Sequence, residues 1–272
     1  MINLYNKLFL QKHLFNDDSK IKKAIEVNRF ANPKIDIDKE VFNIISATEV
    51  LKLLDVGCGN GDLLIRFRKE FGFIGELHGI DLSEGILNAA INENKKSKLG
   101  IAFRVDDAQT LDYPDDSFDA IVSKNVLYYV PDIQKAVDEC HRCLKDGGLF
   151  ISIIYSKNNQ PKLVKLREEV ARKLGSKEVL NPQDRLSAET FNKYLENFSK
   201  VEARNMQNEI RIGFPKPYIE YFDCMRPHFD PIPNDEQWDQ VLNSVKHIIE
   251  REIVQKGNFT DKNAFTIFIA KK

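Results

Sequence analysis

The sequence predicts an α/β fold: a Rossmann-like, doubly wound, mostly parallel sheet with helices on both faces. Three observations predict it. Short apolar runs alternate with amphipathic helical patterns, a glycine-rich turn follows the first strong apolar run, and acidic residues follow the next two. Such alternation is typical of parallel sheets, because each crossover helix returns the chain to the same edge. A chain of 272 residues is also long enough to bury a substantial core.

Seven apolar runs have the composition of strands, and five stretches between them have helical periodicity. The expected strands are 51–56, 76–81, 101–105, 118–123, 148–155, 200–212 and 264–271. The expected helices are 38–49, 61–71, 83–95, 131–144 and 187–197. Right-handed crossovers place the loops after the first, second and fourth strands along one edge, near the point where strand order reverses. A ligand site is expected at that edge.

Three further segments do not belong to this alternation. Residues 1–32 are expected to form about two helices before Pro33 and to act as an N-terminal helical lid. Residues 33–272 then form the main domain, with cap insertions at about 156–186 and 213–260. Both insertions leave from the carboxyl ends of strands, so we expect them to cover the ligand crevice. The first contains a helical pattern at 160–174.

The glycine-rich turn is the most informative stretch, Leu53-Leu54-Asp55-Val56-Gly57-Cys58-Gly59-Asn60-Gly61-Asp62. Glycines without Cβ atoms let the backbone take unusual dihedral angles and let a ligand lie against the peptide planes. A dinucleotide fingerprint needs a glycine in the sixth place, where this chain has Asp62. The carboxylates of Asp55 and Asp62 would repel a pyrophosphate but suit a ligand amine. The turn therefore predicts a positively charged, amino-acid-like ligand rather than NAD.

A second acid adds a ribose to this ligand. Asp81 ends the next strand, about 20 residues beyond the last glycine, at the place where a ribose diol is usually held. One carboxylate can accept hydrogen bonds from both ribose hydroxyls. The alternative role for Asp81 is an N-cap of the helix that starts near Ser83.

Three more segments occur in a recognisable order. These are residues 106–119, which include Asp106-Asp107-Ala108, residues 123–132 and the turn at 143–148. Together with the glycine turn, the chain from 51 to 155 resembles the class I S-adenosylmethionine-dependent methyltransferases of the broad small-molecule type. That family usually has a proline before the paired glycines, where this chain has Asp146, but the turn is remote from the ligand.

The resemblance implies a sheet of seven strands with the last one antiparallel, S-adenosyl-L-methionine as cofactor and S-adenosyl-L-homocysteine as product. Asp107 with the backbone of Ala108 would bind the adenine edge, and Asp55 would orient the turn or reach the methionine ammonium. The implied cofactor-binding residues are Asp55, Gly57, Cys58, Gly59, Asp81, Leu82, Asp107, Ala108 and Asn125. No metal is expected.

The acceptor side is expected after the fourth strand and in the second insertion. Asn125 and Tyr128 are the candidate catalytic residues, because they would lie beside the transferring methyl group. The candidate substrate residues are Tyr129, Tyr218, Tyr221 and Phe222. Two questions stay open: the aromatic residues could merely pack the cap, and Lys124 could form a salt bridge or mark a carboxylate- or phosphate-bearing substrate.

Composition excludes several classes of protein. Lysine and arginine total 40 against 41 acids, a net charge of -1, so the charge of a nucleic-acid binder is missing. The stretch Asn125-Val126-Leu127-Tyr128 lacks the prolines of methyltransferases that act on base amines. No apolar run approaches the ~18 residues of a membrane span, and a cytoplasmic location is expected. The 4 cysteines predict neither disulfides nor a zinc site, and we expect neither His141 nor His228 to be a general base.

The expected function is a methyltransferase that acts on nitrogen or oxygen of a small metabolite or short peptide, by in-line transfer in a lidded pocket. The alternative is a protein that binds S-adenosylmethionine without methyl transfer, as a regulator or for other chemistry. The acceptor, the presence of a general base and the oligomeric state do not follow from the sequence.

Overall fold

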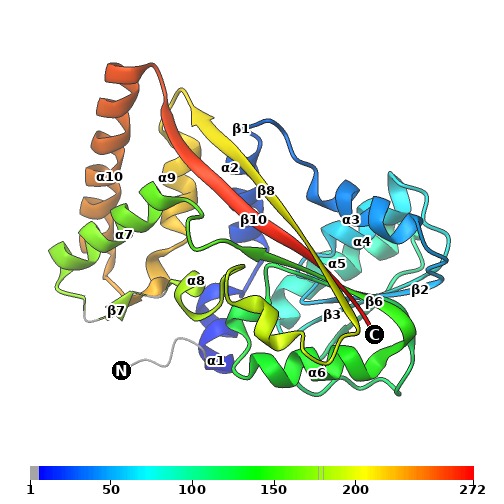
Figure 1. The fold of residues 1–272 in the computed structure, drawn as a ribbon. Helices are drawn as coiled ribbons and strands as arrows, with labels where there is room; N and C mark the ends of the chain where they lie inside the picture. The colour runs from blue at the N-terminus through cyan, green and yellow to red at the C-terminus, as the bar shows by residue number, and fades with distance from the viewer. Residues whose placement is uncertain (1–5, 177, 180) are drawn as a thin grey trace.

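The structure is a computed structural model that describes residues 6–176, 178–179 and 181–272 (Figure 1). Its main element is one eight-stranded sheet. Across the sheet the strands are β1 (Ala31–Asn32), β8 (Lys200–Ile212), β10 (Phe259–Lys271), β6 (Leu144–Tyr155), β5 (Phe118–Lys124), β2 (Lys52–Val56), β3 (Glu76–Asp81) and β4 (Ala102–Val105). The five strands from β6 to β4 are parallel, whereas β10 is antiparallel to both of its neighbours. The doubly wound class is confirmed, and β1 adds an eighth strand to the seven expected.

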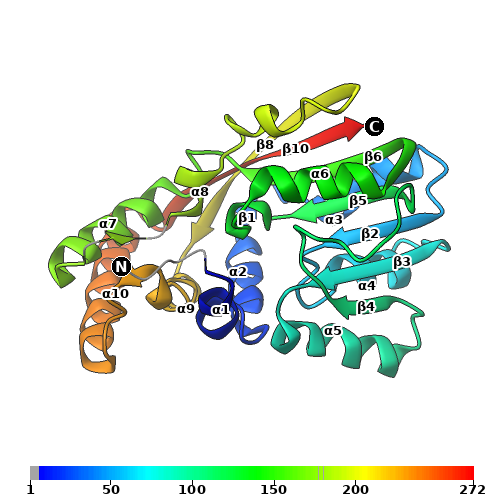
Figure 2. The same ribbon diagram turned by 90° about the horizontal axis from the view of Figure 1, so that it is seen from below.

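Alternate side chains of the strands face two separate cores, which is why helices are needed on both faces. Leu53 belongs to the cluster with helices α3 (Ile37–Ser46) and α4 (Asp62–Lys69). Its neighbour Leu54 belongs to the cluster with α6 (Ile133–Cys143). The remaining helix of this part, α5 (Glu84–Ser97), lies beside β3 and β4 (Figure 2).

The long pair β8 and β10 carries the sheet beyond this layered part. At its far end pack α7 (Pro161–Leu174), α9 (Lys216–Asp223) and α10 (Asp235–Lys256), which form the cap (Figure 1). Two short strands, β7 (Glu178–Val179) and β9 (Phe229–Asp230), pair beside them.

The N-terminal segment fills the space between the two parts. It comprises α1 (Lys7–Phe9), the π-helix Leu10–Leu14 and α2 (Ser19–Asn28). Figures 1 and 2 show α1 and α2 between α9 on one side and the sheet on the other. Among the described residues, no helix has the length and apolarity needed to cross a membrane.

The helix expected at 187–197 is wrong. The structure has α8 (Pro182–Arg185) and a 3-10 helix at Phe191–Tyr194 instead. The Thr190 hydroxyl both accepts from the backbone N–H of Ser187 (3.2 Å) and donates to its carbonyl (3.1 Å). Such local side-chain bonds compete with the helical pattern, so the apolar residues reach the core from turns.

Candidate functional site

A cavity of about 900 Å³ opens at the carboxyl ends of the parallel strands and extends under the N-terminal segment and α9. Nearly all residues predicted for the site line it. They are Asp55, Gly57, Cys58, Gly59, Asp81, Leu82, Asp107, Ala108, Asn125, Tyr128, Tyr129 and Tyr221. The structure therefore brings together residues from four loops and from the cap around one space.

The glycine turn is held by backbone hydrogen bonds and leaves no room for side chains. The N–H groups of Gly57 and Cys58 both donate to the Ile80 carbonyl at 2.8 Å. Gly57 has a φ of +73°, and a Cβ added there would lie 2.3 Å from a methyl group of Val126. The turn thus packs directly against the loop that follows β5.

Asp81 ties the turn to helix α5. Its Oδ2 accepts from the N–H of Gly59 and its Oδ1 accepts from the N–H of Ser83, both at 2.9 Å. The N-cap of α5 is Ser83, whose hydroxyl accepts from the N–H of Ile86. Burial raises the pKa of Asp81, although these N–H groups oppose the rise. Asp81 is therefore not the helix cap, and each of its oxygens keeps a lone pair for a ligand hydroxyl.

Asp55 is a buried carboxylate, and one of its oxygens is free to accept a hydrogen bond from a ligand. Its side chain is 2% exposed, and its Oδ1 has no hydrogen-bond partner among the described residues. Burial raises the pKa of Asp55 to about 7, while the nearby Lys124 ammonium lowers it. A buried acceptor without a donor costs stability, and a cationic ligand group would satisfy it.

Lys124 lies next to Asp55 in a cluster of charges that the sequence did not reveal. Its Nζ lies 2.7 Å from Oδ1 of Asp38, whose Oδ2 lies 2.7 Å from Nη1 of Arg66. Burial lowers the pKa of Lys124, but Asp38 outweighs it and the net shift is upward. Lys124 is therefore a salt-bridged cation, and all three residues also line the cavity. No local pattern predicts this cluster, because its members come from β5, α3 and α4.

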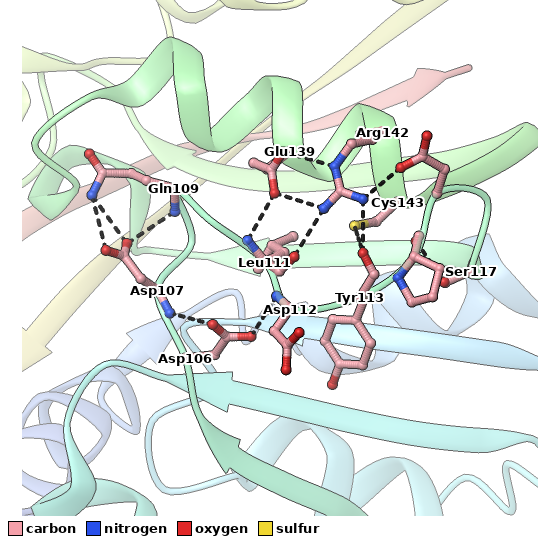
Figure 3. A network of polar contacts seen from close by, with 12 residues as sticks. Asp106, Asp107, Gln109, Leu111, Asp112, Tyr113, Ser117, Glu139, Arg142 and Cys143 are labelled. Atoms are coloured by element: carbon pink, nitrogen blue, oxygen red, sulfur yellow. Dashed lines mark hydrogen bonds and ion pairs between the residues drawn. The ribbon is translucent and has the colours of Figure 1, made fainter.

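The two adjacent acids after β4 have separate roles in the loop (Figure 3). Asp106 closes the loop: its Oδ1 accepts from the N–H of Asp107 and its Oδ2 from the N–H of Asp112. Asp107 accepts from the N–H and the side-chain amide of Gln109 and pairs with Lys7 of the N-terminal segment. Burial alone would raise the pKa of Asp107, but Lys7 and Gln109 hold it below its usual range.

Two residues that the sequence reasoning missed hold this loop in place. The carbonyl oxygen of the Gln109 side chain accepts from the N–H of Asp132, at the start of α6. The Arg142 guanidinium, in the upper right part of Figure 3, donates to the carbonyls of Leu111 and Tyr113 and pairs with Glu139. The loop after β4 is thereby fixed to α6, the helix that follows the loop after β5.

The loop that follows β5 contributes Asn125, Tyr128 and Tyr129 to the lining of the cavity. Asn125 has a φ of +60°, and its Oδ1 is buried without a partner among the described residues. Its amide donates to the hydroxyl of Tyr155 at 3.3 Å. The ring of Tyr128 stacks on that of Tyr155, and Tyr129 meets Phe15 edge to face. Tyr128 thus belongs to the core and to the cavity wall at once.

Tyr218 and Phe222 do not line the cavity, so we withdraw them as substrate residues. They lie four residues apart on α9 and face the interior of the cap. The Tyr218 hydroxyl donates to Asp261 at 2.7 Å, and Phe222 stacks on Trp238. Tyr221 lies on a different face of this helix, lines the cavity and donates to Gln160 at 3.2 Å. Helical periodicity therefore divides these aromatic residues between core and site.

The two histidines differ in position. His228 lines the cavity, but burial lowers its pKa to about 3. His141 packs on Phe198 from α6 and does not line the cavity.

The cavity has two halves that we name for the argument below. The cofactor half is formed by residues 34–38, 55–66, 80–86 and 106–108, with Lys124. The acceptor half is formed by Lys20, by lining residues of 24–31 and 126–131, by Tyr155, by lining residues of 221–228, and by Asn208, Asn263 and Phe265, whereas Ile21 lies against Gly59 of the cofactor half. Asn125 lies where the halves meet.

Comparisons with known proteins agree with this geometry. A family model described as a methyltransferase domain matches residues 47–210. The demethylmenaquinone methyltransferase of Staphylococcus aureus is 35% identical over 123 residues, which are 45% of this chain and 51% of that protein. The chain thus spans about half the length of this relative.

Two solved structures share the fold at low identity. The YcgJ protein from Bacillus subtilis superposes with a TM-score of 0.56 at 17% identity, over 86% of this chain and 98% of the other. The phosphoethanolamine N-methyltransferase 2 of Haemonchus contortus, in complex with phosphomonomethylethanolamine and S-adenosylhomocysteine, has a TM-score of 0.54 at 20% identity, over 87% and 52% of the two chains.

Proposed function

The chain belongs to the methyltransferase-domain family, and from that premise we propose that it transfers a methyl group from S-adenosylmethionine to nitrogen or oxygen of a small metabolite or short peptide. One observation carries the proposal. The cavity that begins at the glycine turn continues without interruption past Asn125 and Tyr128 into the cap. A cofactor site and a second, enclosed space of this kind are what a two-substrate transfer needs.

The charges of the cofactor half fit the methionine end of the cofactor. Asp55 would accept from the ammonium through its unpartnered Oδ1. The carboxylate would lie near Lys124 and Arg66; both pair with Asp38, and Arg66 also pairs with Asp36 and Glu70. A zwitterion placed here would meet a charge of opposite sign at each end.

The other end of the cofactor half fits the nucleoside. Asp81 would accept from the ribose hydroxyls with its remaining lone pairs, and Asp107 would accept from the exocyclic amine of adenine. The carbonyl of Leu82 accepts from Gln11 of the N-terminal segment, so this segment would cover the bound nucleoside. We propose residues 6–32 as the lid on this ground; residues 1–5 of the expected lid lie outside the described residues.

The methyl-side residues would act by positioning. A sulfonium supplies a methyl group that reacts by in-line displacement, so approach geometry and exclusion of water dominate the rate. Asn125 lines the cavity, its Oδ1 has no hydrogen-bond partner among the described residues, and it would face this point. Tyr128, Tyr129 and Tyr221 would form the wall against which the acceptor lies. Each of these tyrosines packs on another aromatic ring, a contact that would limit its movement.

Two measurements test the proposal. Calorimetry should give binding of S-adenosylmethionine and S-adenosylhomocysteine but not of NAD, because Asp55 and Asp62 disfavour a pyrophosphate. A metabolite library that reads out S-adenosylhomocysteine release should then identify an acceptor. Tight NAD binding without either sulfur ligand would overturn the assignment, whereas cofactor binding without release would favour a non-methylating role.

A further inference from the structure

The two halves of the cavity differ in charge. All seven acids that line the cavity, from Asp36 to Asp107, belong to the cofactor half. Among the described residues that line the acceptor half there is no aspartate or glutamate. Acids are present on the helices that form this half, but they lie outside the lining: Asp223, for example, accepts from Trp238 and pairs with Lys23.

Positive charge, in contrast, lies within and behind the acceptor half. Lys20 of α2 lines the cavity and donates to the carbonyl of His13. Arg167 of α7 is 5% exposed and donates a hydrogen bond to the side chain of Asn181 at 3.1 Å. Its guanidinium lies within electrostatic range of the hydroxyl groups of Tyr221 and Tyr129. The pKa of His228 is lowered first by burial and then by the charges of Arg167 and Lys20.

Asp17 and Asp223 oppose the charge of Lys20, and Asp184 opposes that of Arg167, but none of these three acids lines the cavity. Among the described residues, the charged side chains in the lining of this wall, Lys20 and Arg29, are therefore both basic.

The acceptor half also lacks a good proton acceptor. Burial keeps His228 a weak base, with a pKa of about 3. Burial raises the pKa of Tyr155 to about 12 and that of Tyr128 well above its usual range, so both stay protonated at neutral pH. Burial raises the pKa of Asp55 to about 7, but Asp55 belongs to the cofactor half. Among the described residues that line the acceptor half, no carboxylate can take a proton from an acceptor.

We propose that the acceptor is an oxygen acid that binds already ionised, a carboxylate or an acidic phenol or enol, and that cationic amines are disfavoured. This inference rests on the proposed function. Transfer to such an oxygen balances without proton movement: one oxygen–carbon bond forms, one carbon–sulfur bond breaks, and the sulfur keeps the electron pair. Lys20 and Arg167 would act as specificity-determining residues through their charge.

The test measures binding rather than turnover. The protein saturated with S-adenosylhomocysteine is screened by ligand-observed NMR against shape-matched triplets such as 4-hydroxybenzoate, 4-hydroxybenzamide and 4-hydroxybenzylamine. The expected result is that anionic members dominate the binders and bind at least about tenfold more tightly than their amine counterparts, a preference that added salt reduces. Cationic or neutral members that bind equally well, or the absence of any anionic binder, would overturn the inference.

A pair of lysine variants assigns the preference to this wall. Lys20→Gln should lower the affinity for the best anionic probe by about three- to tenfold. Lys23→Gln is the matched control, because Lys23 lies on the same helix but does not line the cavity. Equal effects in both variants would contradict the role of Lys20. Affinity of the Arg167→Gln variant is compared only if its thermal unfolding is cooperative, which shows that the variant is folded.

The two proposals fail in distinguishable ways. If S-adenosylhomocysteine itself does not bind, the proposed function is wrong. If it binds and amines are preferred, only the acceptor class is wrong.

Discussion

The cofactor half and the acceptor half of the cavity are assembled in different ways. In the cofactor half, the functional residues sit at or just after the ends of neighbouring parallel strands. Hydrogen bonds from backbone N–H groups to side chains join them, such as the bond from the Gly59 N–H to the Asp81 carboxylate. In the acceptor half, the walls come from α2, α9, β6 and a 3-10 helix, which are separated by up to about two hundred residues. The first half is thus determined by local spacing and the second by tertiary packing.

This difference predicts that substitutions in the glycine turn have the largest effect. Gly57→Ala should lower the affinity for S-adenosylhomocysteine at least about a hundredfold, because the Cβ would displace Val126 and with it the loop of Asn125. Calorimetry measures this directly. Gly72→Ala is the control, since Gly72 has the same positive φ but no atom within 4 Å. It should lose about 1 to 2 kcal/mol of stability and no cofactor affinity.

Asp81 tests whether the cofactor half uses the same carboxylate for structure and for ligand. Asp81→Ala should weaken cofactor binding by about 1 to 3 kcal/mol, the scale of a charged hydrogen bond left unmade. Ser83→Ala removes the helix cap and the bond from the Ser83 hydroxyl to the Phe15 carbonyl, so it should lower the melting temperature and change affinity less than Asp81→Ala. If Asp81→Ala binds the cofactor as the parent does, its ribose role is wrong.

A tyrosine pair on α9 tests the boundary between wall and core. Tyr221→Phe should lower turnover by about fivefold, the value of one neutral hydrogen bond, with little change in cofactor affinity. Tyr218→Phe should instead lower stability by about 1 to 3 kcal/mol, because Asp261 loses a buried donor, and should leave turnover unchanged. Measurements of turnover and of urea unfolding for both variants distinguish the wall residue from the core residue. Loss of cofactor affinity in Tyr221→Phe would move that residue to the cofactor half.

Asp55 gives the cofactor half a pH dependence opposite in sign to that of His228 in the acceptor half, whose lowered pKa makes stability rise with pH from about 3 to 6.5. The folded pKa of Asp55, about 7, lies above its ordinary value of 3.8. Between these values the folded state holds more protons than the unfolded state, so this residue makes stability fall as pH rises from about 4 to 7. Cofactor affinity should rise over the same range, since the ammonium favours ionised Asp55. Asp55→Asn should flatten both profiles, and unchanged profiles would contradict this role.

The same division explains how much the sequence could predict. The glycine turn, Asp81 and Asp107 follow from spacing, because strand ends of a parallel sheet meet at one edge. The cluster of Lys124, Asp38 and Arg66 could not be predicted, since it joins residues from three elements. The error at 187–197 arose because the apolar pattern was helical while the hydroxyls of the segment formed turns.

In the cap, the missing information was helical register. Tyr218, Tyr221 and Phe222 are all aromatic, and only the position of α9 decides which of them faces the cavity. A signal for α10 was present and unused. Asn234 and Gln237 form a capping box at its start, the pattern that marks a helix N-terminus.

The smallest effect is expected in the N-terminal segment, which contacts the cofactor half and contributes α2 to the wall of the acceptor half. Its contacts to the cofactor half are few: Lys7 with Asp107, Gln11 with the Leu82 carbonyl, and the Phe15 carbonyl with the Ser83 hydroxyl. Few polar contacts imply a low local free energy of opening, so cofactor and then acceptor should slow amide exchange across residues 15–30. Residues 217–222 should gain less protection, because Tyr218 and Phe222 are already buried in the cap. Exchange that is identical with and without ligand in residues 15–30 would contradict the lid. A larger gain in 217–222 would instead place the moving element in the cap.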